Sequence, residues 1–165
     1  MAATLPKTNA IRLLEAAGVA FSLYSFPVDE GHQDAVEVAA LIGVAADRVF
    51  KTLVAVDEAG NHHVMILPGS CELNRKKAAR AAGVRGIDLI RLAELTPLTG
   101  YVRGGCSPLG MKKPFPTWLD ETAQLFDRIV VSAGQRGLQM ELAPDDLLAV
   151  CRLTGSPRAE LADLI

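Results

Sequence analysis

The chain lacks the features that mark several classes of protein. Its longest apolar run, Val38–Ala46, ends at Asp47, so no segment is long enough to cross a membrane. Its first residues lack the basic segment and apolar core of a secretory signal. The cysteines Cys71, Cys106 and Cys151 are few and stand at unrelated spacings. We therefore expect a reduced cytoplasmic protein without a disulfide framework or a Cys-x-x-Cys metal site.

No charge of one sign dominates the sequence. The 165 residues include 17 Lys plus Arg and 19 Asp plus Glu, which gives a formal charge of −2. This balance excludes a protein that binds nucleic acid with its whole surface, although a local basic face remains compatible with it. Half of the residues are apolar, and the length suits a single domain spanning residues 1–165.

The spacing of apolar residues predicts a fold of mixed helices and strands. Helices are expected at residues 8–18, 34–42 and 74–82, with a last helix from Pro144. Strands are expected at 19–26, 48–56, 63–67, 128–132 and 138–142, and a short strand and helix within 87–98. Because hairpins mix with helices without regular alternation, the sequence predicts an α+β fold around a mixed sheet.

Lys51 lies within the strongest predicted strand, where both faces are apolar. Val49, Leu53 and Ala55 share its face, and lysine is seldom buried in such surroundings without a partner. A fixed ammonium beside a pocket suits a phosphate or a developing oxyanion. An edge-strand lysine that reaches water is an equally good interpretation of the pattern alone.

A glycine-rich loop runs from Gly104 to Gly110. Its glycines and Pro108 let the backbone approach a ligand closely, although an ordinary turn is the commoner explanation. The loop fits neither the G-x-G-x-x-G pattern nor a P-loop, which argues against a dinucleotide or ATP site.

Basic residues gather in two places, and a solvated surface is their usual explanation. They contact phosphates only if both clusters border one groove. The residues are Arg75, Lys76, Lys77 and Arg80 on the predicted helix, and Lys112 and Lys113 after the glycine loop.

No residues suggest a metal site or a catalytic triad. His62 and His63 are neighbours in a strand, so they point in opposite directions, and no further ligand stands at a suitable spacing. Cys106 has no evident His and Asp or Asn companions, and no serine lies in a G-x-S-x-G motif. We expect no cofactor and no nucleophile of the protein's own.

Four stretches, in order along the chain, resemble the YbaK/EbsC family of prolyl-tRNA editing domains. They are Val49–Val54, Cys71–Lys77, Gly104–Lys113 and Gly137–Leu147. The resemblance implies a small mixed β-barrel flanked by helices. It also implies a freestanding aminoacyl-tRNA deacylase that removes cysteine from tRNA(Pro), with prolyl-tRNA synthetase as a possible partner for tRNA identity.

The resemblance also assigns roles to individual residues. Lys51 matches the essential lysine of the family, thought to hold the phosphate of the terminal adenosine, and Thr52 follows it as in the family. Asp146 matches an acidic position near the pocket, and Phe26 stands near a position that commonly carries Tyr. The loop that grips the aminoacyl group matches Gly104, Gly105, Cys106, Ser107 and Pro108.

The family mechanism explains why no triad is needed. In its cysteine-specific members, the substrate's own thiol is proposed to attack the ester carbonyl, while the enzyme supplies positioning and charge stabilisation. Two alternatives stay open at this point. One is a deacylase for another small amino acid, such as alanine, and the other is a non-catalytic module that binds a nucleotide or an aminoacyl-tRNA.

Overall fold

The computed structural model describes residues 5–31 and 33–165. Its helices begin and end close to the predicted bounds because local signals fix them. Thr8, Asp34 and Asn74 accept hydrogen bonds from backbone amides at the helix starts, and a left-handed glycine follows each of these helices. The α-helices are α1 (Asn9–Ala17), α2 (Ala35–Ile42), α3 (Arg75–Ala82), α4 (Leu92–Thr99) and α5 (Pro144–Leu153), and the 3₁₀ helices are η1 (Ala46–Arg48) and η2 (Glu121–Leu125).

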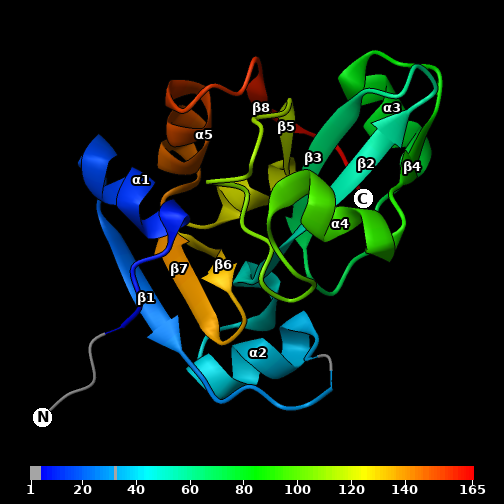
Figure 1. Ribbon diagram of the computed structural model, residues 1–165. Helices are drawn as coiled ribbons and strands as arrows, with labels where there is room; N and C mark the ends of the chain where they lie inside the picture. Colours follow the sequence, from blue (N-terminus) through cyan, green and yellow to red (C-terminus); the bar gives the residue numbers. More distant parts are fainter. Residues whose placement is uncertain (1–4, 32) are drawn as a thin grey trace, which may run out of the picture.

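The strands form two sheets (Figure 1). The smaller, antiparallel sheet has the order β1-β7-β6, with β1 at Phe21–Ser25, β7 at Leu138–Leu142 and β6 at Ile129–Gln135. The larger sheet has the order β4-β2-β3-β5-β8 and is mixed, since β5 pairs in parallel with both β3 and β8. Its strands are β2 (Phe50–Asp57), β3 (His62–Pro68), β4 (Ile87–Leu89), β5 (Thr117–Asp120) and β8 (Ala159–Ala162).

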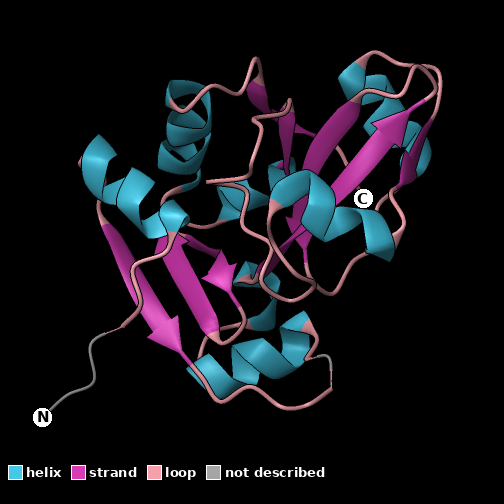
Figure 2. Cartoon of the chain, viewed as in Figure 1, coloured by secondary structure: helices cyan, strands magenta, loops and turns pink. Residues whose placement is uncertain are grey.

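The α+β class and the mixed sheet are confirmed, but the implied barrel is wrong. The sheets meet through one isolated parallel bridge, between Val49, which directly precedes β2, and Val130 of β6. Hydrogen bonding therefore does not run from one sheet around to the other, and the described strands form no closed barrel. Helices cover the sheets, and Figure 2 shows them around both groups of strands.

The β2–β3 hairpin contributes to a separate core on each of its faces. Phe50 and Ile66 belong to a core shared with α1, β6, β7 and α5. Ala55 and Met65 point the other way, into a core with α3 and Trp118. This arrangement explains why both faces of the strand read as apolar in the sequence. No helix within the described residues has the length and apolar character to span a membrane.

Candidate functional site

A cavity of about 520 Å³ opens beside β2. β4 pairs only with Ala55–Asp57, so the earlier part of β2 has an open edge, and this edge forms one wall. The start of α2, the β4–α4 segment and the glycine loop form the other walls. Among the lining residues, Gly69 lies so close to Ala35 that an added Cβ would clash with the alanine Cβ. Glycine is therefore required where β3 passes α2.

Lys51 and Thr52 both lie on the lining of this cavity. Lys51 is half-buried, and none of the ion pairs within the described residues includes it. The Thr52 hydroxyl is the single buried side-chain oxygen or nitrogen in the described part of the chain without a hydrogen-bond partner. A buried hydroxyl without a partner costs about 1–3 kcal/mol of stability.

The glycine loop reaches the cavity through Gly104 and Cys106. Gly104 has a φ of +83°, which favours glycine, and a Cβ on Gly105 would stand 2.9 Å from the backbone nitrogen of Arg136. The loop therefore rests directly on the β6–β7 turn. Gly105, Ser107 and Pro108 are buried and support the loop without lining the cavity.

Cys106 is a poor candidate for a nucleophile. Its side chain is buried, and that burial raises the pKa of the thiol to about 12. Because the thiolate is the reactive form, a thiol with this pKa stays protonated at neutral pH. Cys106 therefore shapes the cavity wall as a small apolar residue.

Phe26 and Asp146, which the resemblance also places at the substrate, do not lie on the cavity lining either. Asp146 stands in the first turn of α5, a helix that packs against β5, β8 and α1, and its carboxylate suits the helix dipole there. Phe26 directly follows β1, and its backbone amide donates to the Gly137 carbonyl at 3.0 Å. Its position extends the β1–β7 ladder.

Neither basic cluster lines the cavity. On α3, Arg75 pairs with Asp88 at 2.7 Å and Lys77 with Asp163 at 3.2 Å, while Lys112 donates to the Pro97 carbonyl. The cationic residues that do line the cavity with Lys51 are Arg91 and Arg103. The remaining members of the two clusters, Lys76, Arg80 and Lys113, are exposed.

Sequence reasoning missed several polar and cationic residues of the cavity: Gln33, Arg91, Arg103, Ser132 and Gln139. Gln139 is buried between the buried Leu138 and Met140 of β7. A polar residue inside such a strand was a usable signal. Arg103 directly precedes the glycine loop, which was a second signal.

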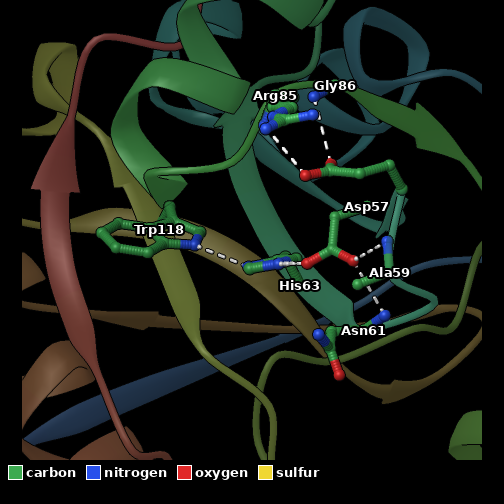
Figure 3. Close-up of polar contacts among 8 residues, drawn as sticks. Asp57, Ala59, Asn61, His63, Arg85, Gly86 and Trp118 are labelled. Atoms are coloured by element: carbon green, nitrogen blue, oxygen red, sulfur yellow. Dashed lines mark hydrogen bonds and ion pairs between the residues drawn. The ribbon is translucent and has the colours of Figure 1, made fainter.

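The two neighbouring histidines have separate structural partners. His63 is buried, and Figure 3 shows its ring between Asp57 and Trp118. Trp118 Nε1–H donates to His63 Nδ1 at 3.4 Å, which leaves the proton on Nε2 to be donated to Asp57 Oδ2 at 3.0 Å. His62 instead lies against the Phe115 ring, with 5.6 Å between centroids.

The Asp57 carboxylate also closes the β2–β3 turn. Its Oδ1 accepts from the amides of Ala59 and Asn61, and next to it Glu58 accepts from the amides of Arg85 and Gly86 (Figure 3). The hydrogen bond from His63 and those from the amides of Asn61 and Ala59 hold the pKa of Asp57 below its ordinary value. Among residues 5–31 and 33–165, no group of three His, Cys, Asp or Glu side chains could hold a metal ion.

Comparison with known proteins gives consistent matches over most of the chain. The family model for the aminoacyl-tRNA editing domain matches residues 29–150. A protein of Enterococcus faecalis, EbsC, named as a candidate Cys-tRNA(Pro)/Cys-tRNA(Cys) deacylase, is 46% identical over 158 residues, covering 96% of this chain and 94% of the relative. A proline–tRNA ligase of Pelobacter propionicus is 30% identical over 102 residues, which are 62% of this chain and 18% of the ligase.

Solved structures share the fold. The hypothetical protein APE2540 has a TM-score of 0.81 and 26% identity, with 95% of this chain and 99% of that chain covered. A protein described as a candidate trans-editing enzyme for prolyl tRNA synthetase has a TM-score of 0.77 and 27% identity, with 96% and 98% covered.

Proposed function

Because the chain belongs to the family of aminoacyl-tRNA editing domains, we propose that it is an aminoacyl-tRNA deacylase that removes cysteine from tRNA(Pro). The single observation that carries this proposal is the placement of Lys51. This residue, which makes no ion pair with a carboxylate within the described residues, lines one cavity with the glycine loop. A volume of about 520 Å³ suits an aminoacyl ester and part of its nucleoside.

The proposed chemistry uses the substrate's own thiol. Its sulfur attacks the ester carbonyl, a sulfur–carbon bond forms, and the bond from the carbonyl carbon to the ribose oxygen breaks. The thiol proton ends on that ribose oxygen, so the products are a cyclic thiolactone and uncharged tRNA. Lys51 stabilises negative charge on the terminal phosphate or the carbonyl oxygen, and the rigid loop limits the orientations of the ester.

In this mechanism the side chains of the cavity lining position the aminoacyl ester and supply no nucleophile. Thr52 and Gln139 both belong to the cavity lining, and in this proposal their hydroxyl and amide groups bond the amino group and the ester of the bound residue. Cys106 contributes no thiolate, because burial raises its pKa to about 12. This division of roles supports a mechanism in which the substrate supplies the nucleophile.

A partner supplies the choice of tRNA in this proposal. A small pocket distinguishes amino acids that differ by one methylene by only about 1–3 kcal/mol, so it selects weakly among small residues. Prolyl-tRNA synthetase is the partner we propose. Sequence similarity to a stretch of a proline–tRNA ligase supports this choice.

The test is deacylation of tRNA(Pro) charged with cysteine, serine or alanine by one preparation of the protein. We expect rapid loss of cysteine and far slower loss of serine, which has a similar shape but a poorer nucleophile. Faster loss of alanine would identify an alanine deacylase. Binding without turnover of any of the three would identify a non-catalytic module.

A further inference from the structure

The two sides of the cavity mouth differ in charge. On the α2 side, Asp34 lines the cavity, and Glu37 follows in the first turn of the helix. On the other side, Arg91 and Arg103 line the cavity and are exposed. Arg91 has one ion-pair partner, Glu94 at 3.5 Å, and Arg103 has none within the described residues. The mouth therefore attracts phosphate on one side and repels it on the other.

Large apolar side chains lie exposed beside these arginines. Leu89 is 40% exposed and Leu92 is 59% exposed, and both line the cavity, as does the half-buried Leu95. They belong to one segment, residues 89–95, which connects the end of β4 with the first turn of α4. We call this segment the β4–α4 shelf. Exposed apolar surface beside cations is the combination that single-stranded nucleic acid needs for its bases and its backbone.

The direction of the bound RNA follows from the charges beside the cavity. Under the proposed function the ester lies in the cavity that Lys51 and Cys106 line, so the rest of the polynucleotide must leave through the mouth. Each nucleotide carries a phosphate, and the side with Asp34 and Glu37 is unfavourable for it. The favourable path runs over the shelf and past Arg103.

We propose that the β4–α4 shelf, together with Arg103, binds the nucleotides that precede the terminal adenosine of the tRNA. Leu89 and Leu92 contact the bases, and Arg91 and Arg103 contact the phosphates. This inference rests on the proposed function, because it assumes that the cavity holds the 3′ end of an aminoacyl-tRNA.

The first test measures how binding of an uncharged CCA-ending RNA depends on salt, by fluorescence anisotropy. The slope of log K against log salt is negative, and loss of one phosphate contact to a single strand decreases its magnitude by about 0.7. We expect this decrease in Arg103→Ala and in Arg91→Ala. Arg12→Ala, an exposed arginine on α1 away from the cavity lining, is the matched control and should keep the wild-type slope. Unchanged slopes in both shelf variants would overturn the proposal.

The second test compares kcat/KM for Cys-tRNA(Pro) with that for a cysteine ester of adenosine 5′-phosphate, which lacks the preceding nucleotides. Leu92→Asn, Arg91→Ala and Arg103→Ala should lower the value for the tRNA by a larger factor than the value for the small ester. Leu125→Asn is the matched control, since Leu125 is 77% exposed and lies off the cavity lining. Equal losses on both substrates would contradict a subsite for the preceding nucleotides.

The outcomes separate this proposal from the function on which it rests. If the wild-type protein turned over neither substrate, the deacylase proposal would fail, and the salt slopes would still decide whether the shelf binds RNA. If Leu92→Asn acted only when prolyl-tRNA synthetase was present, the shelf would be a surface for a protein partner instead.

Discussion

The two ends of the β2–β3 hairpin hold polar residues in opposite situations. At the turn, Asp57 and His63 are buried in a network that uses the carboxylate and both ring nitrogens. At the other end, the Thr52 hydroxyl is buried without a partner, and Lys51 lacks a carboxylate within the described residues. Satisfied polar groups stabilise the fold, whereas buried polar groups without a partner cost stability. Asp57 and His63 therefore hold the structure, and Lys51 and Thr52 are the residues that we propose act on a substrate.

The largest effect is expected at the cavity end, in Lys51→Ala. Loss of one group that stabilises transition-state charge lowers kcat by about 10²–10³, or about 2.7–4 kcal/mol. Single-turnover deacylation of Cys-tRNA(Pro) measures this loss. Thermal unfolding should show a midpoint close to that of wild type, because Lys51 makes no ion pair within the described residues. Full activity of the Lys51→Ala variant would contradict a catalytic role for Lys51.

At the turn end, Asp57→Ala should lower stability and leave deacylation largely intact. Removal of the carboxylate leaves His63 and two backbone amides without their acceptor, which costs about 1–3 kcal/mol of unfolding free energy. Urea unfolding measures this cost. The pKa of Asp57 is lowered on folding, so its contribution is present above its ordinary value of 3.8 and is lost as the pH falls through the folded value. The difference between variant and wild type should therefore shrink below that pH.

Thr52→Val should make the protein more stable and less active. The substitution keeps the shape of the side chain and removes a hydroxyl that is buried without a partner, which should raise the unfolding free energy by up to about 1 kcal/mol. The same change removes a hydrogen bond to the bound ester, so KM or kcat for Cys-tRNA(Pro) should worsen. Thr52→Ser is the control that restores the hydroxyl. A less stable valine variant would mean that the hydroxyl has a partner in solution.

The smallest effect is expected in Cys106→Ala. Because burial keeps this thiol protonated, with a pKa of about 12, its loss should change deacylation by less than tenfold, or about 1.4 kcal/mol. An inactive variant, together with a trapped acyl-enzyme, would make Cys106 the nucleophile and overturn the substrate-assisted mechanism.

Sequence reasoning succeeded where the determinants are local. The helix ends at Thr8 and Gly18 follow from capping chemistry, and the β2–β3 hairpin follows from alternating residues around the turn at residues 57–61. β5 and β8 were not predicted. Each is short, and each pairs in parallel with a strand distant in the sequence. Such pairing leaves no local signal.

The candidate site was predictable only where local sequence signals identify its residues. A charged residue in an apolar strand singles out Lys51 in the sequence, and the cavity lining includes it. Arg91 reaches the cavity only because β4 pairs with the last residues of β2 and leaves the earlier edge open. The resemblance places Asp146 near the pocket, yet this residue lies in the first turn of α5, outside the cavity lining. Tertiary contacts decide both positions.

Side-by-side measurement of stability and deacylation in Lys51→Ala and Asp57→Ala decides whether the two ends of the hairpin have separate roles. We predict that Lys51→Ala melts like the wild type and has lost most of its activity on Cys-tRNA(Pro). We predict that Asp57→Ala melts at a lower temperature and, assayed well below that temperature, still deacylates. Parallel loss of stability and activity in both variants would contradict the separation of the two ends of the hairpin.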